Sequence, residues 1–422
     1  MPRSPIRPKP IAPARVAAFD VLLQVATGNG NSDDLLHSAI TVKLSPEDRH
    51  LATALVLGTL RWQIALDGRI QSLLERPDQR LAEPVAIALR LGAFQLLHLD
   101  RIPPHAAIHE SVELTRFGGH PYAAGMVNAI LRKLIVTKSP GKPIHESAAA
   151  IARRLAHPQW MVERWIHQYG RADAIKICEA DQIEPAGPVL FQDSSDTNLP
   201  RIDDGSRLVA ELAAAAAPQA KRVWDTCAAP GGKTLILAHQ LPQAEILATD
   251  ISSRRLAAMR TRLAGYCYAT KIQTEVGDAS MPSDAERHFD LILADVPCSG
   301  TGTLGRNPEI RLRLESADLI RHADRQRRIL RTALSRLALG GRLIYSTCSL
   351  EPEECERVIE NVTAEPAFGA SIRVLPLQPM LDLFETQNVF REPLREAVRG
   401  NFLRTLPGVH STDGFFAALF ER

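Results

Sequence analysis

The stretch Asp225-Thr-Cys-Ala-Ala-Pro-Gly-Gly-Lys-Thr234 decides how the second half of this 422-residue chain is expected to fold. A short apolar run, Arg222-Val-Trp, precedes it, and an apolar helical pattern, Leu235-Ile-Leu-Ala-His, follows it. A strand, a glycine-rich turn and a helix in this order open a nucleotide-type site in an α/β sheet. Gly231 and Gly232 permit positive φ and a close approach of the backbone to a ligand. The N–H groups that begin the next helix then favour a carboxylate or a phosphate.

Two further features bear on the class of ligand. The next apolar run, Glu245-Ile-Leu-Ala-Thr-Asp250, ends on an acid 25 residues after Asp225, where it can accept hydrogen bonds from ribose hydroxyls. The turn is not G-x-G-x-x-G, so a dinucleotide site has weak support. It ends in Gly-Lys-Thr234 like a phosphate-binding loop, although Cys227 stands where that motif needs its first glycine. Because Leu291-Ile-Leu-Ala-Asp295 could be a magnesium-binding strand, a P-loop NTPase stays an alternative.

Composition narrows the class of protein. The net charge of +2 is too small to indicate nucleic-acid binding by the protein as a whole, so a nucleic-acid-binding surface would have to be a local basic patch. Six cysteines form no C-x-x-C pair and no zinc spacing, so we expect no metal site and reduced thiols in a cytoplasmic protein. Residues 1–12 are basic and proline-rich without an apolar core, which indicates a disordered tail and no signal peptide. No apolar stretch approaches bilayer length, so we expect no membrane partner.

The pattern of apolar residues divides the rest of the chain into three regions. Residues 13–140 carry i, i+3, i+4 spacing in successive segments, which predicts an all-helical domain. Residues 141–204 follow the linker Ser139-Pro-Gly-Lys-Pro143 and read as short helices and an irregular connector with at most one strand. Residues 205–422 alternate strands and helices, which predicts a doubly wound, mostly parallel sheet. The predicted strands are 222–225, 245–250, 271–276, 290–295 and 342–347, and the predicted helices are 233–240, 253–264, 316–338 and 352–363.

Two cysteines lie past the predicted ends of the fourth and fifth strands. Cys298 belongs to Asp295-Val-Pro-Cys-Ser-Gly-Thr-Gly302, and Cys348 belongs to Tyr345-Ser-Thr-Cys-Ser349. Both stand among Ser, Thr and Gly rather than in an apolar run, and adjacent parallel strands would bring them to one crevice beside the glycine turn. Most free cysteines are small buried hydrophobic residues. We interpret the following three in that way: Cys178, Cys267 and Cys355.

Taken together, three motifs resemble the RNA (cytosine-5) methyltransferases that use S-adenosylmethionine. They are Asp225-x-Cys-Ala-Ala-Pro-Gly-Gly-Lys233, Asp295-x-Pro-Cys-Ser-Gly-Thr-Gly302 and Thr347-Cys-Ser349. The helical N-terminal region resembles the NusB-like domain fused to the Sun/Fmu-type branch of the bacterial 16S ribosomal RNA methyltransferases. The resemblance covers residues 14 to 420 approximately, and the other phrases that carry it are Val127-Asn-Ala-Ile-Leu-Arg132, His157-Pro-Gln-Trp160 and Asp413-Gly-Phe-Phe416.

The resemblance implies a Rossmann-like, S-adenosylmethionine-dependent methyltransferase domain behind a NusB-like RNA-binding domain. In that family Cys348 would add to the ring carbon beside the methylated one, which is nucleophilic catalysis. Cys298 would assist release, and Asp295 would hydrogen-bond the cytosine edge at N3. A free thiol has a pKa near 8.5, so Cys348 needs an electropositive or polar environment. The resemblance assigns the cofactor to Cys227, Ala228, Ala229, Pro230, Gly231, Gly232, Lys233, Asp250, Asp278 and Asp295.

An arginine-rich stretch is the candidate RNA surface. Between Arg306 and Arg342 there are ten arginines against four acidic residues, and Arg321, Arg325 and Arg328 recur at helical spacing. Such a run is usually a solvated face, but here it follows a strand-end motif, so phosphate contact is an equal alternative. We expect RNA, taken as 16S ribosomal RNA, to be the partner of a monomeric enzyme. An RNA-binding assembly factor that has lost activity stays the non-enzymatic alternative, and the presence of both strand-end cysteines argues against it.

Overall fold

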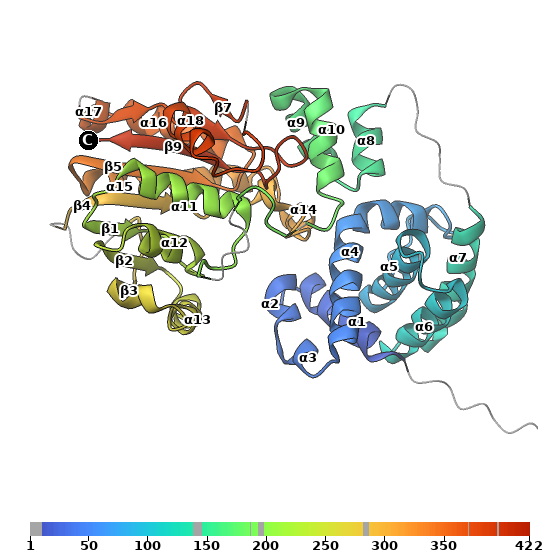
Figure 1. Cartoon of the computed structure of the whole chain (residues 1–422). Coiled ribbons are helices and arrows are strands. Elements are labelled where there is room, and N and C mark those ends of the chain that lie inside the picture. Colours follow the sequence, from blue (N-terminus) through green and yellow to red (C-terminus); the bar gives the residue numbers. More distant parts are fainter. Residues whose placement is uncertain are drawn as a thin grey trace, which may run out of the picture. The chain divides into compact units, whose positions relative to one another are not determined.

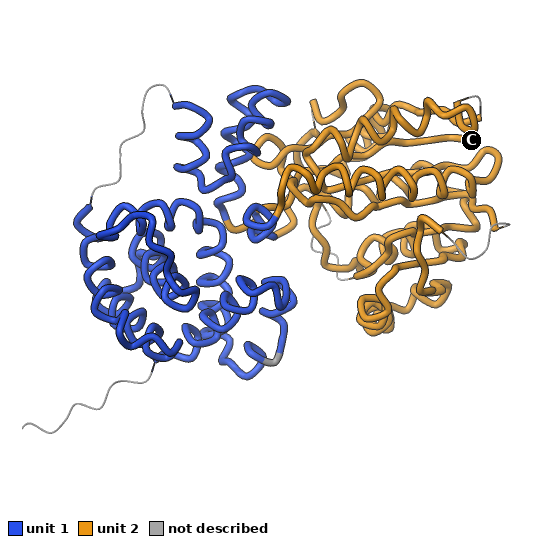
Figure 2. Tube along the Cα trace, turned by 180° about the vertical axis from the view of Figure 1, so that it is seen from behind, with its two compact units in different colours: residues 1–183, 305–313 blue, residues 184–304, 314–422 orange. Residues whose placement is uncertain are grey.

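The computed structural model describes residues 11–137, 146–185, 187–192, 198–281, 287–369, 371–394 and 396–422. The chain forms two compact units, which Figure 2 shows in different colours. The first unit is Met1–Ile183 with Gly305–Arg313, and the second is Glu184–Leu304 with Leu314–Arg422. The linker Ser139–Pro143 and residues 1–10 of the expected tail lie outside the described residues.

The first unit is built of helices (Figure 1), and mostly aliphatic side chains form the core between them. Its longest helix begins where the Ser45 hydroxyl accepts the Asp48 N–H at 3.1 Å and Pro46 occupies the first turn, a favourable N-terminal sequence. Leu55, Leu89 and Leu131 are completely buried between the helices. The helices are α1 (Pro13–Ala26), α2 (Ser32–Leu36), α3 (Ala39–Val42), α4 (Pro46–Gln71), α5 (Glu83–His98), α6 (Pro104–Phe117), α7 (Ala124–Val136), α8 (Ala148–Arg154), α9 (Gln159–Tyr169), α10 (Arg171–Ala180) and α14 (Ile310–Arg313).

The segment Gly305–Arg313 belongs to the helical unit although it follows a strand of the second unit in sequence. Arg61 donates to the Gly305 carbonyl at 2.8 Å, and the Glu309 carboxylate accepts the N–H and the hydroxyl of Ser32 at 3.0 and 2.9 Å. The guanidinium of Arg311 is buried and donates to three backbone carbonyls. Buried donors and acceptors therefore fix this segment among the helices of the first unit.

The second unit contains one twisted sheet, with nine strands among the described residues. The strand order is β3-β2-β1-β4-β5-β9-β8-β7, and β6 also pairs with β9. The pairs from β3 to β5 are parallel, whereas β9 runs antiparallel to β5. The predicted fold class, a doubly wound and mostly parallel sheet, is confirmed. The strands are β1 (Arg222–Asp225), β2 (Glu245–Asp250), β3 (Ile272–Val276), β4 (Phe289–Asp295), β5 (Leu337–Thr347), β6 (Arg373–Leu375), β7 (Val398–Arg399), β8 (Phe402–Arg404) and β9 (Phe416–Glu421).

Helices cover both faces of this sheet (Figure 1), so its central strands are apolar on both sides. Leu291 and Leu293 of β4 pack with α11, α12 and α18, whereas Ile292 and Ala294 pack with α15 and α16. The helices are α11 (Asp204–Ala216), α12 (Gly232–Gln240), α13 (Ser253–Leu263), α15 (Asp318–Ser335), α16 (Glu356–Thr363), α17 (Pro366–Gly369) and α18 (Gln378–Thr386).

The sequence located β1 and β2 at their observed bounds, but it missed the antiparallel side of the sheet. Strand β5 begins at Leu337 rather than at 342, because the Gly340-Gly341 pair interrupts the apolar pattern without ending the strand. Strands β6 to β9 are not followed by a turn motif and a helical pattern like those after β1 and β2, so the sequence pattern did not predict them. Cys267, expected to be buried, is exposed, because it lies in a surface 3₁₀ turn (Cys267–Lys271) before the edge strand β3.

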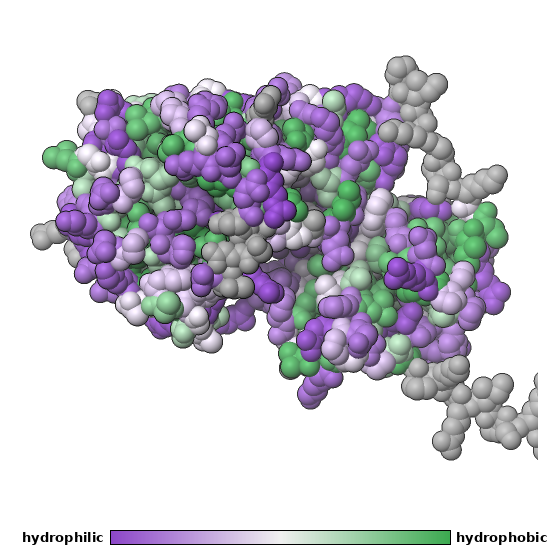
Figure 3. Space-filling view, in the orientation of Figure 1, coloured by the Kyte–Doolittle hydropathy of each residue, from purple (hydrophilic) through white to green (hydrophobic). Residues whose placement is uncertain are grey.

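Hydrophilic side chains cover most of the face drawn in Figure 3, with smaller apolar areas among them. Within the described residues no helix combines the length and the apolar character needed to cross a bilayer. The connector expected over residues 184–204 contributes an isolated bridge between Phe191 and Phe390, and no strand is assigned to its described residues.

Candidate active site

Two thiols meet at the carboxyl ends of β4 and β5. The Sγ atoms of Cys298 and Cys348 are 3.3 Å apart, and both residues are partly exposed. The strands that carry them are adjacent and parallel, with Asp295 opposite Ser346 in the register. Parallel neighbours bring equivalent strand ends to the same edge of a sheet.

The close approach of the two cysteine loops depends on Gly302. The Gly302 N–H donates to the Cys348 carbonyl at 2.9 Å, and the Gly302 carbonyl accepts the Gly414 N–H at 2.8 Å. A Cβ at this position would lie 2.2 Å from the Gly414 oxygen and 2.9 Å from the Cys348 oxygen. A side chain therefore cannot be accommodated unless one backbone moves, which explains a glycine in this motif.

A salt bridge lies next to the thiols. Lys233 Nζ is 2.7 Å from Asp295 Oδ2, and it also donates to the Ser206 hydroxyl at 3.0 Å. The other carboxylate oxygen, Asp295 Oδ1, accepts the Ser346 hydroxyl at 2.8 Å. Burial alone would lower the pKa of Lys233, but the Asp295 and Asp203 carboxylates outweigh burial and raise it above the ordinary value. Lys233 is therefore an ammonium at neutral pH.

The environment of Cys348 opposes ionisation overall. The contact with Cys298, burial and the negative charge of Asp295 raise the pKa of the Cys348 thiol, and the Lys233 ammonium partly offsets them. Because the thiolate is the reactive form of a cysteine, Lys233 is the nearby charge that favours reactivity. The sequence placed Lys233 on the cofactor side, whereas the structure also joins it to Asp295.

The glycine turn joins β1 to α12. Gly231 has φ +93°, and a Cβ there would lie 2.8 Å from the Met259 side chain. The buried Asp225 carboxylate accepts the Thr234 hydroxyl at 2.6 Å, and burial raises the pKa of Asp225 to about 7. In a phosphate-binding loop that hydroxyl would contact magnesium. Here it is engaged by Asp225, which removes support for the P-loop NTPase alternative.

Two acids follow the ends of β2 and β3, beside the turn. Asp250 accepts the Ala229 N–H at 3.3 Å and the Ser252 N–H at 2.9 Å, and its carbonyl accepts the Gly277 N–H at 3.1 Å. The adjacent Asp278 is half-buried. Burial would raise its pKa, but hydrogen bonds from Ser280 and the nearby charges of Arg325 and Arg328 lower it.

The remaining turn residues are distributed between interior and surface. Ala228 and Ala229 are buried, Pro230 is exposed, and the Ala228 N–H donates to the Thr249 carbonyl at 2.8 Å. Cys227 is partly exposed, yet its thiol lies in a desolvated environment that raises its pKa to about 12. Cys227 is therefore a neutral thiol, unlike the reactive thiolate of an activated cysteine. Among the described residues no group of His, Cys, Asp or Glu side chains could hold a metal ion.

Comparison with known proteins identifies the family of this chain. Residues 213–421 match the family described as 16S rRNA methyltransferase RsmB/F, and residues 12–136 match the NusB family. The probable ribosomal RNA small subunit methyltransferase B of Bacillus subtilis (strain 168) is 31% identical over 95% of this chain and 97% of its own length. The chain belongs to the RsmB/F family. It is accordingly an RNA methyltransferase.

Other relatives support the same assignment. The ribosomal RNA small subunit methyltransferase B of Escherichia coli O1:K1 / APEC is 31% identical, over 89% of this chain and 91% of its own. The crystal structure of PH0851 aligns over 99% of this chain and 100% of its own, with a TM-score of 0.74 at 20% identity, which supports the fold. A methyltransferase homolog protein from Pyrococcus horikoshii covers 66% of this chain with a TM-score of 0.51 at 25% identity.

Sequence reasoning missed several side chains that hold the candidate active site together. Ser206 and Ser346 contact the Lys233–Asp295 pair, and the exposed Arg255 side chain lies 3.4 Å from the Asp250 carboxylate. The signal for Ser346 was its place two residues before Cys348. Ser206 comes from α11, which precedes the first motif, so only the folded structure identifies it.

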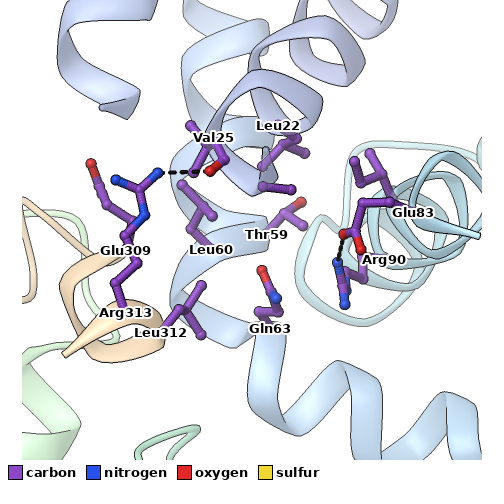
Figure 4. Close-up of a pocket in the computed structure, with 12 residues that line it drawn as sticks. Leu22, Val25, Thr59, Leu60, Gln63, Glu83, Arg90, Glu309, Leu312 and Arg313 are labelled. Atoms are coloured by element: carbon purple, nitrogen blue, oxygen red, sulfur yellow. Dashed lines mark hydrogen bonds and ion pairs between the residues drawn. The ribbon is translucent and has the colours of Figure 1, made fainter. Parts of the chain in front are cut away.

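A separate pocket lies in the helical unit of the methyltransferase (Figure 4). Side chains of α1, α4 and α5 line it together with three residues of the segment Gly305–Arg313, namely Glu309, Leu312 and Arg313. Arg313 donates to the Val25 carbonyl at 2.7 Å on one side, and Arg90 pairs with Glu83 at 2.8 Å on the other. None of the candidate active-site residues lines this pocket.

Proposed function

We propose that this RNA methyltransferase transfers a methyl group from S-adenosylmethionine to C5 of a cytosine, through a covalent bond between Cys348 Sγ and C6 of the base. In this proposal residues 205–422 are the catalytic domain, residues 13–140 are a NusB-like RNA-binding domain, and residues 141–204 connect them. The observation that carries the proposal is the pair of partly exposed thiols 3.3 Å apart, next to the Lys233–Asp295 salt bridge.

The proposed reaction needs one thiol to attack the base and a second group to accept a proton. C5 of cytosine is a poor nucleophile until a thiolate adds to C6 and places electron density on C5. After the methyl group has been added, the proton at C5 must leave before the C6–S bond can break. Cys348 supplies the attacking sulfur, and Cys298 is close enough to accept that proton, directly or through one water. Loss of the proton expels Cys348 and leaves 5-methylcytosine.

The Lys233–Asp295 pair gives the base edge a charged partner. Adding a thiolate to C6 places negative charge on the pyrimidine, and a preorganised donor stabilises such charge in the transition state. Asp295 contacts the cytosine edge at N3 through a shared proton, which the Lys233 ammonium, 2.7 Å from the carboxylate, can supply. Ser346 and Ser206 fix the orientation of this pair.

The residues around the glycine turn fit S-adenosylmethionine, which supplies the methyl group when bound. The turn Cys227–Lys233 would hold its methionine and ribose portions, and Asp278 would lie near the adenine amine. Asp250 would bind the ribose hydroxyls and share its carboxylate with Arg255. These acids suit a neutral-to-cationic, hydroxyl-bearing ligand better than a triphosphate, because carboxylates repel phosphate.

RNA is the substrate class that the family supports, and we propose 16S ribosomal RNA. The relatives described above are named for ribosomal RNA of the small subunit. Arg321 and Arg328 are exposed on α15, where they can contact phosphates without reading sequence. A base inside folded RNA must be splayed out before a thiolate can reach C6. We also propose a reducing, cytoplasmic compartment, because a catalytic pair of thiols must stay reduced to react.

The deciding experiment is methylation of 16S ribosomal RNA from cells that lack the gene, with bisulfite mapping of the modified base. Cys348→Ala should abolish 5-methylcytosine formation and leave S-adenosylmethionine affinity close to that of the wild type. Cys267→Ala, which changes an exposed cysteine of the same unit, should retain full activity. Turnover by Cys348→Ala would contradict the nucleophile assignment. RNA binding without methylation by the wild type would favour an inactive assembly factor.

A second variant separates attack from release. Cys298→Ala keeps the Cys348 nucleophile but lacks the group that accepts the C5 proton, so the protein–RNA bond should persist after methyl transfer. A protein–RNA band that survives denaturing electrophoresis measures this intermediate. The double variant Cys298→Ala/Cys348→Ala is the matched control and should show no such band. If Cys298→Ala gives no band either, the release role is wrong.

A further inference from the structure

A buried carboxylate lies directly behind the two thiols. Glu354 has no exposed surface, although it comes only six residues after the partly exposed Cys348. It lies at the end of a 3₁₀ turn, Pro352–Glu354, where its N–H donates to the Glu351 carbonyl at 3.0 Å and its carbonyl accepts the Tyr345 hydroxyl at 2.7 Å. Both ends of its backbone are therefore fixed.

The carboxylate accepts four hydrogen bonds. Glu354 Oε1 accepts the Ser299 N–H at 2.9 Å and the Gln326 side-chain amide at 3.0 Å. Glu354 Oε2 accepts the hydroxyls of Ser299 and Ser349, the second at 2.5 Å. The two hydroxyl oxygens are themselves 3.1 Å apart. Removing this acceptor would leave buried donors unpaired, which costs free energy, so the four hydrogen bonds are a strong local constraint.

The donors come from both cysteine loops. Ser299 follows Cys298 directly, and Ser349 follows Cys348 directly. Gln326 adds a third element, because the same amide also donates to the Pro297 carbonyl at 3.0 Å. Glu354 is therefore a common acceptor for the residues that follow both thiols. Gln326 of α15 also binds the loop that carries Cys298.

We propose that Glu354 is a positioning residue that sets the distance between Cys298 and Cys348 by binding Ser299 and Ser349 at once. The inference rests on the proposed two-cysteine chemistry, since it explains how that pair is kept in register. Glu354 does not touch the substrate, and it acts only through the two loops. Displacement of a catalytic group by about 1 Å can cost on the order of 10²-fold in rate.

The test compares two replacements of Glu354. Glu354→Ala leaves four donors without their acceptor, so we expect kcat to fall by about 10²-fold while KM for S-adenosylmethionine stays close to that of the wild type. Glu354→Gln can keep the geometry, since its oxygen can replace Oε1 and its amide can donate to hydroxyls that also accept. We therefore expect Glu354→Gln to recover most of kcat.

A second measurement does not depend on methylation. A diazene oxidant such as diamide takes two hydrogen atoms from a pair of nearby thiols to form a disulfide and a hydrazine. The rate of Cys298–Cys348 coupling, mapped by peptide mass spectrometry, reports their approach. It should fall in Glu354→Ala and stay near the wild-type rate in Glu354→Gln. Glu353→Ala is the matched control, because that neighbouring acid pairs with Arg357 at 2.9 Å.

The outcomes separate the two proposals. Unchanged kcat and unchanged coupling in Glu354→Ala would overturn the positioning role, as would equal losses of kcat, cofactor affinity and thermal stability in both replacements. If Glu354→Ala does not fold, Ser299→Ala, which keeps the carboxylate, should still slow coupling. A wild-type protein that couples its thiols but does not methylate cytosine would contradict the proposed function and leave the coupling comparison valid.

Discussion

At the scale of single residues, neighbouring groups act on the pKa of the Cys348 thiol in opposite directions. Lys233 lowers the pKa of Cys348, while Cys298, burial and Asp295 raise it. The net effect is a raised pKa for this thiol, so in the proposed mechanism the step that forms the thiolate depends on pH. Lys233 is the side chain best placed to change that dependence, because it contacts Asp295 and acts on Cys348 at the same time.

Lys233→Met should slow methylation at neutral pH by about 10²-fold, the usual effect of removing one preorganised charge. Removing a cation raises the pKa of a nearby acid, so the rising limb of the pH–rate profile should move to higher pH. The measurement is kcat/KM against pH, with Lys233→Arg expected to restore part of the profile. Lys271→Met, an exposed lysine that donates to the Pro242 carbonyl, is the control. A profile unchanged in shape and position would contradict this role.

Asp225 gives a stability prediction with a definite sign. Burial raises its pKa from 3.8 to about 7, so between these pH values the folded chain holds a proton that the unfolded chain releases. The free energy of unfolding therefore falls across this interval as the pH rises, by about 1.4 kcal/mol for each pH unit. Above about pH 7 this contribution no longer changes with pH. Asp225→Asn keeps an acceptor for Thr234 and lacks the titration.

The stability of Asp225→Asn relative to the wild type should therefore increase between about pH 4 and pH 7. Urea denaturation of both proteins at pH 5 and pH 7.5 measures the difference. A constant difference across these two conditions would show that the carboxyl group does not titrate in this range.

At the scale of elements, the site depends on two loops that cross at Gly302. A Cβ there would overlap backbone oxygen atoms of Cys348 and Gly414, and backbone cannot move aside as a flexible side chain can. Gly302→Ala should destabilise the second unit by about 1–3 kcal/mol, the typical result of overpacking, and should also reduce methylation. Thermal melting followed by an activity assay tests both effects.

Gly125→Ala in α7 is the comparison for Gly302→Ala, because a Cβ there meets open space. Replacing glycine by alanine inside a helix is neutral or favourable, so this variant should melt at or above the wild-type temperature. If both variants melt alike, the crossing at Gly302 is looser than its contacts indicate.

The same elements show what sequence can predict. Helices separate β1 from β2, β2 from β3 and β4 from β5, and the motifs at these strands end in residues of distinct chemistry, so the meeting of Cys298, Cys348 and Asp295 at one edge could be inferred. Glu354 could not, because it lies at the start of the predicted helix 352–363, where consecutive glutamates are typical of a solvated first turn. Strand β9 was missed because its antiparallel pairing with β5 is a tertiary contact that no local pattern of the sequence indicates.

At the scale of the whole molecule, one stretch of backbone from the second half of the sequence belongs to the helical unit. The segment Gly305–Arg313 leaves the second unit just after the 3₁₀ turn Thr301–Thr303 and packs in the helical unit (Figure 2). Arg311 fixes it there, with a guanidinium whose pKa burial lowers to about 10 and which donates to the carbonyls of Arg61, Ala156 and Asp181. The helical unit is therefore complete only when this segment is present.

Arg311→Met should release the segment from the helical unit. The three carbonyls would lose their buried donor, so the free energy of unfolding of that unit should fall by roughly 2–4 kcal/mol. Trypsin, which cleaves after arginine, should cut after Arg306 and Arg313 faster than in the wild type, because a released segment can enter the protease. Arg321→Met, which removes an exposed arginine of α15, should change neither the melting temperature nor the rate of those two cuts. Unchanged cleavage in Arg311→Met, measured by mass spectrometry over time, would mean that the other contacts suffice, among them Arg61 with the Gly305 carbonyl and Ser32 with Glu309.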